Sequence, residues 1–410
     1  MTRRVAVTGM GLVSPLGLDV ATSWAGLLAG RSGIGPLPAA MRECRLRCRV
    51  CGVAPEFDAK DFLPRTHRRT MGRVSMLACL AAKEAVAQAG LDDATLSGPR
   101  TSVCAGSTTG SSSELDSFFG EFHKHRDAGL IEATKFLKVM SHTVASGVAA
   151  LLGVRGQVFS PASACATSTQ AVGMAMQMIR CGMADVVVCG GADELHETTI
   201  GVFDIVRAAS ENFNDQPTRT PRPFDAQRDG TAISEGAAML VLEAEDHARA
   251  RGAAPLGFVR GFGGANHCGH QSQPDADAMV ASMHAALADA QLDPGAVGYV
   301  NAHATGTVLG DPVEAQAIAR VFGESVAVSG VKGYTGHTLA AAGAMEAIFC
   351  MEMMRRQTLI ATRNLDDIDP QCRGVRHLLQ HATQPTQFSL SNSFAFGGVN
   401  GTLILEHAES

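Results

Sequence analysis

The sequence contains few large aromatic residues: two tyrosines and one tryptophan occur among its 410 residues, together with 44 glycines. It contains no recognisable signal peptide and no apolar run long enough to cross a membrane. Its eleven cysteines form no regular framework of the kind that stabilises small secreted domains. These absences argue against a membrane protein or a disulfide-rich secreted protein. We expect a protein of a reducing compartment, with the cytoplasm as the default.

Charge and hydrophobic content set the next limits. The chain has a formal net charge of −6, which argues against general nucleic-acid binding because that function requires an excess of positive charge. Hydrophobic residues make up 46% of the chain, so it can bury a large core, and two halves of similar size are expected. We place the boundary near Arg251, which gives an N-terminal half over residues 1–252 and a C-terminal half over residues 253–410.

The apolar pattern predicts strands alternating with helices in both halves. In the first half, strands are expected at residues 4–8, 184–191 and 238–242, and helices at 65–90 and at the apolar run 171–179. In the second half, strands are expected at 256–261, 298–302, 326–329, 387–392 and 401–406, and helices at 276–290, 312–322 and 340–355. An α/β protein with βαβ-rich halves, and hence an internal duplication of architecture, follows.

Two segments resemble ligand motifs but are better explained otherwise. Residues 8–14 (TGMGLVS) are similar to a dinucleotide fingerprint, yet a serine replaces the third glycine and no acidic residue ends a second strand nearby. In residues 44–50, Cys44, Leu46, Cys48 and Val50 alternate with arginines, which favours a half-buried strand over a metal cluster.

Cys165 is the leading candidate for a reactive group. It lies among small residues in the segment FSPASACATSTQ, just before the apolar run, and we expect it in the first turn of a buried helix. Free N–H groups and the helix dipole favour a thiolate there, and a cysteine pKa of about 8.5 can fall by one or more units. A small buried cysteine packed among alanines is the alternative that this segment alone leaves open.

Three further segments place polar groups at the ends of expected strands, where α/β proteins build their sites. They are residues 301–307 (NAHATGT), 332–337 (KGYTGH) and 391–400 (SNSFAFGGVN). Each is weak evidence alone, because a single histidine is often structural and a glycine-rich turn is often only a turn.

Together these motifs resemble the elongating β-ketoacyl-acyl carrier protein synthases of the thiolase superfamily. Six separated motifs occur in the family's order, namely residues 8–14, 164–166, 223–230, 301–307, 332–337 and 391–400, so the likeness spans nearly the whole chain. The resemblance implies a thiolase-like fold of five layers, α-β-α-β-α, built from two duplicated halves. The N-terminal half would carry the cysteine, and the C-terminal half would carry two histidines and a gate loop.

The resemblance also assigns roles. Cys165 would take an acyl chain from a phosphopantetheine thioester, and His303 and His337 would stabilise the charge that develops as a malonyl group loses carbon dioxide. Lys332, with Glu346 as its partner, would fix charge and orientation around the histidines. No metal and no redox cofactor is implied, since acyl carrier protein carries the substrates on its phosphopantetheine.

The resemblance also implies residues that would bind the substrate or its oxyanion without forming a covalent bond to it. The N–H groups of Cys165 and Phe396 would form an oxyanion hole, and the residues expected to contact substrate are Thr305, Thr307, Phe394, Phe396, Thr109 and Asn400. The chain departs from the family at Ala304 and Ala395, where glycine is usual, at Val399, where threonine is usual, and at Tyr334, where methionine is usual. The methyl group of Ala395 should restrict the backbone freedom of the gate.

The partners remain open at this point. Basic clusters are either solvated faces or docking sites for an acidic carrier protein; the candidates are Arg65, Arg68, Arg69, Lys124 and Arg126. A homodimer is expected, or a heterodimer with a subunit similar to a chain-length factor. The alternative function is therefore a ketosynthase subunit of a type II polyketide or polyene synthase. A non-catalytic subunit is disfavoured because Cys165, His303 and His337 are all present, and a degradative thiolase because the terminal glycine loop lacks a cysteine.

Overall fold

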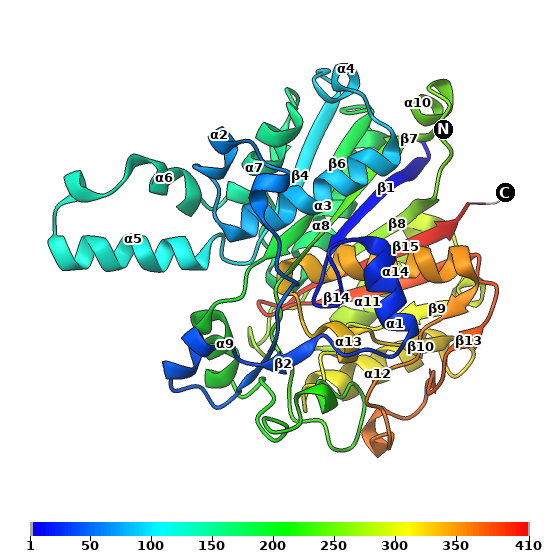
Figure 1. Ribbon diagram of the computed structural model, residues 1–410. Coiled ribbons are helices and arrows are strands. Elements are labelled where there is room, and N and C mark those ends of the chain that lie inside the picture. The colour runs from blue at the N-terminus through cyan, green and yellow to red at the C-terminus, as the bar shows by residue number, and fades with distance from the viewer. Residues whose placement is uncertain (1–2, 409–410) are drawn as a thin grey trace.

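The computed structural model describes residues 3–408 (Figure 1), which form one eleven-stranded mixed sheet, flanked by helices, with two small two-stranded sheets. From one edge to the other, the strands of the C-terminal half are β12 (Arg376–His377), β10 (Ala327–Ser329), β9 (Tyr299–Asn301), β14 (Phe388–Phe394), β15 (Val399–His407) and β8 (Gly257–Asn266). Those of the N-terminal half follow as β1 (Val5–Val13), β7 (Gly236–Ala244), β6 (Val186–Asp193), β4 (Thr101–Gly106) and β5 (Val158–Phe159). The two sets join where Ala6 pairs with Phe258 and Val7 with Gly257. The small sheets pair β2 (Ile34–Pro36) with β3 (Val50–Gly52) and β11 (Thr358–Leu359) with β13 (Ala382–Thr383).

The helices cover the sheet in three layers. In chain order they are α1 (Val20–Leu28), α2 (Arg65–Arg68), α3 (Arg73–Ala89), α4 (Asp93–Leu96), α5 (Ser112–His125), α6 (Ala133–Val139), α7 (Thr143–Leu152), α8 (Thr167–Arg180), α9 (Glu197–Ile205), α10 (Glu245–Ala250), α11 (Ala276–Ala290), α12 (Gly310–Phe322), α13 (Lys332–Thr335) and α14 (Ala342–Arg356). Helices α3 and α7 pack on one set of strands, α11 and α12 on the other, and α8 and α14 lie between the two sets. The five layers α-β-α-β-α predicted from the resemblance are confirmed.

One part of the chain stands away from this body. Figure 1 shows α5 projecting to one side with α6 running back beside it. Lys135 and Lys138 of α6 pair with Glu121 and Glu114 of α5 at 2.5 and 2.9 Å, which holds the two helices together. We call residues 112–139 the arm. No helix within residues 3–408 combines the length and the apolar character needed to cross a membrane.

The glycine motif near the N-terminus proves to be strand rather than turn. β1 continues through Val13 instead of ending at Thr8. A Cβ on Gly9 would lie 2.0 Å from the carbonyl oxygen of Ala85, and one on Gly11 would lie 1.9 Å from that of Ala81. These glycines therefore let α3 pack directly against β1, and the likeness to a dinucleotide fingerprint reflects close packing.

The expected helix over residues 65–90 is interrupted. α2 ends at Arg68 and α3 begins at Arg73, because Gly72 takes an extended conformation (φ −81°, ψ 175°). A Cβ on Gly72 would lie 2.4 Å from the Ser111 hydroxyl, so the loop before α5 meets the chain at this break. A helical periodicity that spans both pieces hides the break in the sequence.

The prediction of a half-buried strand over residues 44–50 was wrong, although buried and exposed side chains do alternate over residues 47–50. Only Val50 belongs to a strand, while Cys48 and Val50 are buried and the arginines face solvent. The Asp204 carboxylate accepts the N–H groups of Arg47 and Cys48 at 2.6 and 3.1 Å. Side chains of another segment thus satisfy the backbone that a neighbouring strand would have paired.

Candidate active site

Cys165 lies in a tight turn between the sheet and α8. The turn is a 3₁₀ helix (Ala164–Ala166), and α8 begins at Thr167, so Cys165 precedes the helix instead of lying in its first turn. Ala164 adopts φ 45°, a left-handed conformation that is costly for a residue with a side chain. The Ser163 N–H donates to the Thr167 hydroxyl at 2.8 Å, which fixes the turn against the helix.

The thiol of Cys165 is buried, with only 4% of the residue exposed, and lies 3.0 Å from Nε2 of His337. Burial raises the pKa of the Cys165 thiol to about 12, while the Lys332 ammonium acts in the opposite direction. The expectation of a lowered thiol pKa is therefore wrong for this state, because desolvation outweighs the opposing effect of Lys332. Burial, together with Lys332, holds the pKa of His337 well below its ordinary value, so a neutral thiol faces a neutral imidazole.

His303 follows β9 and is held by α12. The two carboxylate oxygens of Glu314 accept the N–H groups of His303 and Ala304, each at 2.7 Å. Asp311, one turn earlier, accepts the Gly306 N–H at 3.1 Å. Ala304 has φ 32°, a left-handed conformation that favours glycine, and the bond from its N–H to Glu314 helps to hold the backbone there.

Lys332 sets the proton position on His303. Its ammonium lies 3.3 Å from Nδ1 of His303 and 2.5 Å from the His303 carbonyl oxygen, and it forms an ion pair with Glu346. An ammonium only donates, so Nδ1 must accept and Nε2 carries the ring proton. Burial, then Lys332 and His337, hold the pKa of His303 well below its ordinary value, which keeps this tautomer neutral.

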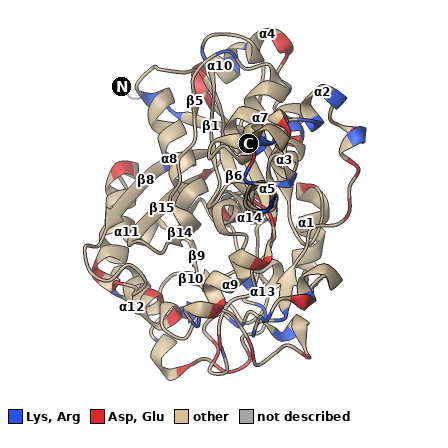
Figure 2. Cartoon of the chain, turned by 90° about the vertical axis from the view of Figure 1, so that its left-hand side faces the viewer, with Lys and Arg blue, Asp and Glu red and all other residues tan. Residues whose placement is uncertain are grey.

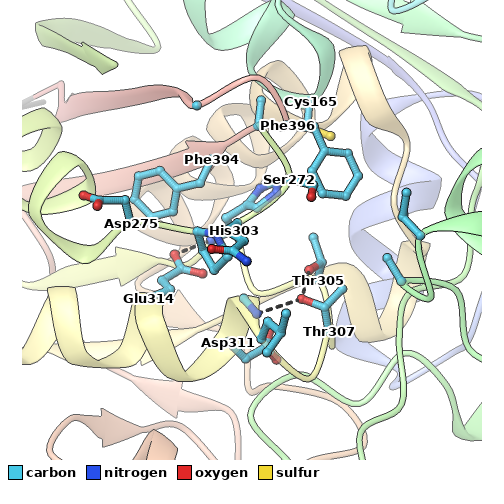
Figure 3. Close-up of a pocket in the computed structure, with 18 of the residues that line it drawn as sticks. Cys165, Ser272, Asp275, His303, Thr305, Thr307, Asp311, Glu314, Phe394 and Phe396 are labelled. Carbon is cyan, nitrogen blue, oxygen red and sulfur yellow. Dashed lines mark hydrogen bonds between the residues drawn. The ribbon is translucent and has the colours of Figure 1, made fainter. Parts of the chain in front are cut away.

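Cys165, His303 and His337 line a cavity of about 260 Å³ (Figure 3). Phe394 and Phe396 lie on one side of it, and Thr305 and Thr307 lie on the other, with His303 between them. The hydroxyls of Thr305 and Thr307 are 3.1 Å apart, and Asn400 also lines this cavity. The structure thus brings together the residues that the sequence placed in three separate segments.

A second cavity of about 390 Å³ meets the first at Cys165. Thr109 lines it, together with Leu115 and Phe119 of the arm. Cys165, Phe203 and Phe396 line both cavities, and the rings of Phe203 and Phe396 are 5.6 Å apart. Phe396 therefore lies where an aromatic side chain can separate the two spaces.

The predicted docking residues lie outside both cavity linings. Arg65 and Arg68 belong to α2, Arg69 follows it, and Lys124 and Arg126 lie at the end of α5. Figure 2 shows the basic cluster at α2. Within residues 3–408, none of these five side chains forms an ion pair with an acidic group, so their charge remains available to a partner.

Sequence reasoning missed the groups that support the site. Asp311 and Glu314 were assigned no role, although two acids spaced by three residues at a helix start, just after the His303 segment, could have indicated one. Phe203 on α9 gave no such signal. It packs edge to face against His337, with ring centroids 6.2 Å apart, and only the fold reveals that contact.

The side chains of Cys165, His303 and His337 also have the composition of a metal site. Ligand atoms of Cys165, His303 and His337 all lie within 4.8 Å of one another. A metal-bound histidine usually donates its other N–H to an acceptor, whereas Nδ1 of His303 faces an ammonium. The arrangement therefore suits donation to a substrate oxygen better than it suits metal ligation.

Comparison with known proteins gives the family. Residues 2–248 match the family described as "Beta-ketoacyl synthase, N-terminal domain", and residues 256–366 match "Beta-ketoacyl synthase, C-terminal domain". The chain belongs to the β-ketoacyl synthase family. This β-ketoacyl synthase is 34% identical over 406 residues to the "3-oxoacyl-[acyl-carrier-protein] synthase 1" of Haemophilus influenzae, covering 98% of this chain and 99% of the relative.

Two solved structures are similar over the full length. A β-ketoacyl synthase from Burkholderia phymatum STM815 superposes with a TM-score of 0.96 at 40% identity, covering 99% of this chain and all of that one. "The ishigamide ketosynthase/chain length factor" superposes with a TM-score of 0.91 at 29% identity, covering 100% of both chains. This β-ketoacyl synthase is therefore an acyltransferase-type enzyme with the thiolase-like fold.

Proposed function

We propose that the enzyme is a 3-oxoacyl-acyl carrier protein synthase of the cytoplasm, which extends an acyl chain by two carbons through decarboxylative condensation. The observation that carries the proposal is the position of Cys165 at the junction of two cavities, 3.0 Å from a neutral His337 and beside a His303 whose tautomer Lys332 sets. The name of the Haemophilus relative supports the carrier-protein substrate.

Acylation uses the Cys165 and His337 pair. The thiol proton passes to Nε2 of His337 as sulfur attacks the thioester carbonyl of the acyl carrier, and the leaving pantetheine thiolate takes that proton. Sulfur stays acylated, with the N–H groups of Cys165 and Phe396 as donors to the tetrahedral oxyanion. Metal chemistry and redox chemistry have no part in this step.

Condensation follows with malonyl carrier protein. The C–C bond to the malonyl carboxylate breaks, carbon dioxide leaves, and the electron pair moves toward the thioester oxygen, where His303 donates from Nε2 with His337 beside it. The resulting carbanion attacks the acyl carbonyl on Cys165, and the released sulfur takes up a proton. Thr305 and Thr307 hold the pantetheine arm, Phe394 and Phe396 gate malonyl entry, and Asn400 supports that loop.

The acyl chain occupies the second cavity. Most of the hydroxyls that line this cavity are paired within the protein, Thr109 with Ser112 at 3.0 Å and Thr198 with Nδ1 of His196 at 2.8 Å. The cavity consequently presents methyl groups and rings such as Leu115, which fits an apolar chain. Arg65, Arg68, Arg69, Lys124 and Arg126 bind the acidic carrier protein, and the functional unit is a dimer.

A second candidate is the ketosynthase subunit of a type II polyketide or polyene synthase that acts with a chain-length-factor-like partner. The full-length similarity to a ketosynthase/chain length factor favours it. The arm offers a contact surface for such a partner, since Phe119 and Phe136 are 51% and 63% exposed.

Intact-mass analysis of carrier-protein products separates the two. The purified protein alone is given a series of acyl carrier proteins with saturated primers, together with malonyl carrier protein. Products heavier by two carbons establish a self-sufficient synthase. Acylated Cys165 without extension, relieved when a partner subunit is added, establishes the second candidate, and absence of acylation would contradict both.

A further inference from the structure

Asp193 is a buried acid that neither the sequence motifs nor the mechanism uses. It is the last residue of β6, is 2% exposed and lines neither cavity. Its Oδ1 accepts the N–H of Thr108 at 3.0 Å. Its Oδ2 accepts the Thr108 hydroxyl at 2.6 Å and the Ala340 N–H at 2.8 Å. One carboxylate therefore bridges two segments that are more than 200 positions apart in the sequence.

Both segments belong to the reaction site. Thr108 follows β4 and forms part of the wall of the second cavity. Ala340 lies in a 3₁₀ turn (Leu339–Ala341) that begins two residues after His337. Leu339 of that turn lines the second cavity as well, and its φ of 51° is a left-handed conformation that an isolated leucine avoids.

The bond from the Ala340 N–H to Asp193 ties the residue after that strained leucine to the end of β6. Within residues 3–408 the Asp193 carboxylate meets only neutral donors and has no cation in ion-pair distance, so hydrogen bonds hold it in place. Its charge also helps to raise the pKa of the Cys165 thiol. A turn that is held in an unfavourable backbone conformation relaxes when a hydrogen bond that holds it is removed. Relaxation here would shift the cavity wall and the segment that carries His337 at the same time.

We propose that Asp193 is a positioning residue, whose carboxylate holds the Thr108 wall of the acyl cavity and the turn after His337 in one arrangement. This role rests on the proposed condensing function. It predicts that loss of Asp193 impairs two steps that use different substrates, acylation of Cys165 and decarboxylation of malonyl carrier protein.

The near-isosteric Asp193→Asn variant tests this directly. An amide nitrogen donates and does not accept, so whichever way the Asn side chain turns, its NH₂ group faces another donor: the Thr108 N–H at the place of Oδ1 or the Ala340 N–H at the place of Oδ2. We expect kcat/KM for acylation and the rate of decarboxylation each to fall by roughly tenfold or more. Thr108→Val, which removes only the hydroxyl bond on the cavity side, should lower acylation by long primers while leaving decarboxylation near the wild-type rate, and Thr108→Ser should restore acylation.

Glu84→Gln is the matched control. Glu84 is a partly buried acid, its carboxylate accepts the N–H groups of Leu12 and Val20 at 2.9 Å each, and it lines neither cavity. Burial raises the pKa of both Glu84 and Asp193 to about 7, so the two acids respond to desolvation in the same direction. We expect Glu84→Gln to lower the melting temperature and to leave both rates unchanged.

The outcomes are distinguishable. If Asp193→Asn lowers the melting temperature as Glu84→Gln does but leaves both rates at wild type, Asp193 is only structural and the proposal fails. If Asp193→Asn does not fold, Thr108→Val tests the proposal, which predicts a lower acylation rate and an unchanged decarboxylation rate. An equal loss of both rates in Thr108→Val would overturn the proposal. Failure of the wild-type enzyme to acylate Cys165 would instead overturn the proposed function itself.

Discussion

The Lys332 ammonium lies 3.3 Å from Nδ1 of His303 and pairs on its other side with the buried Glu346 carboxylate. Burial raises the pKa of Glu346 to about 7, and Lys332 opposes that shift. The lysine thus serves two buried groups: it offers Glu346 a counter-charge, and it obliges His303 to carry its proton on Nε2. The orientation of a donor in the decarboxylation step is therefore set by a residue that need not touch substrate.

Lys332→Met should impair decarboxylation more than acylation. Without the ammonium His303 is free to change tautomer, and loss of one oriented donor costs roughly 10²- to 10³-fold in rate. The measurement is carbon dioxide release from malonyl carrier protein, compared with the rate at which Cys165 gains an acyl group. Lys138→Met removes a Lys–Glu pair on the arm and should leave both rates unchanged. Equal losses in the two steps of Lys332→Met would contradict the assignment.

Alkylation of Cys165 should rise with pH without levelling off near neutrality. Only the thiolate reacts, and the pKa of this thiol is raised to about 12, so the thiolate fraction grows by roughly tenfold per pH unit between pH 7 and 9. Mass spectrometry of the Cys165 peptide after timed exposure to iodoacetamide gives the rate, with the exposed Cys44 as a reference for the reagent. A plateau below pH 8 would show the low thiol pKa that the sequence suggested.

The sequence predicted elements well where one periodicity dominates. The helix expected over residues 276–290 is α11 (Ala276–Ala290) to the residue, because its apolar spacing coincides with a capping aspartate, Asp275. The helix expected over 65–90 is interrupted at Gly72, whose backbone is extended and lies close to the loop before α5. Such a contact connects positions far apart in the chain, so no local pattern reports it.

In the candidate site, too, local motifs predicted some features, whereas others depend on contacts formed only in the folded chain. Motifs sufficed to choose Cys165, His303 and His337, whose ligand atoms the fold brings within 4.8 Å of one another. They could not foresee the neutral thiol, because the pKa of a group depends on how completely the folded chain excludes water from it. The roles of these residues in the reaction stay predictions.

Phe396→Ala should uncouple decarboxylation from acylation. The ring lies between the two cavities, and its removal should let malonyl carrier protein reach the histidines before Cys165 is acylated. We expect carbon dioxide release without an acyl primer to rise by roughly tenfold, which corresponds to about 1.4 kcal/mol. Phe119→Ala, at the arm side of the second cavity, is the control and should leave primer-free release unchanged. An unaltered basal rate in Phe396→Ala would refute a gate at this position.

Ala395→Gly should make condensation faster and widen the range of primers accepted. Ala395 stands where the family usually has glycine, and its added methyl restricts the loop that carries Phe396. Removing a restriction of about 0.5–1 kcal/mol corresponds to a roughly two- to fivefold change in rate. The check is the turnover rate across primers of increasing length, and an unchanged rate and chain-length profile would exclude gate stiffness as a limit.

Arg68→Glu combined with Arg69→Glu should raise the KM for acyl carrier protein while kcat at saturation stays close to wild type. Both residues lie outside the cavity linings, so reversing their charge weakens encounter with an acidic partner without moving the reacting groups. We expect a rise of roughly tenfold at low ionic strength that shrinks as salt screens the interaction. Arg249→Glu, a single reversal on α10 outside both cavities, is compared with the single variant Arg68→Glu and controls for net charge. If the α2 variant leaves KM unchanged, or if Arg249→Glu raises it equally, the carrier protein does not dock at α2.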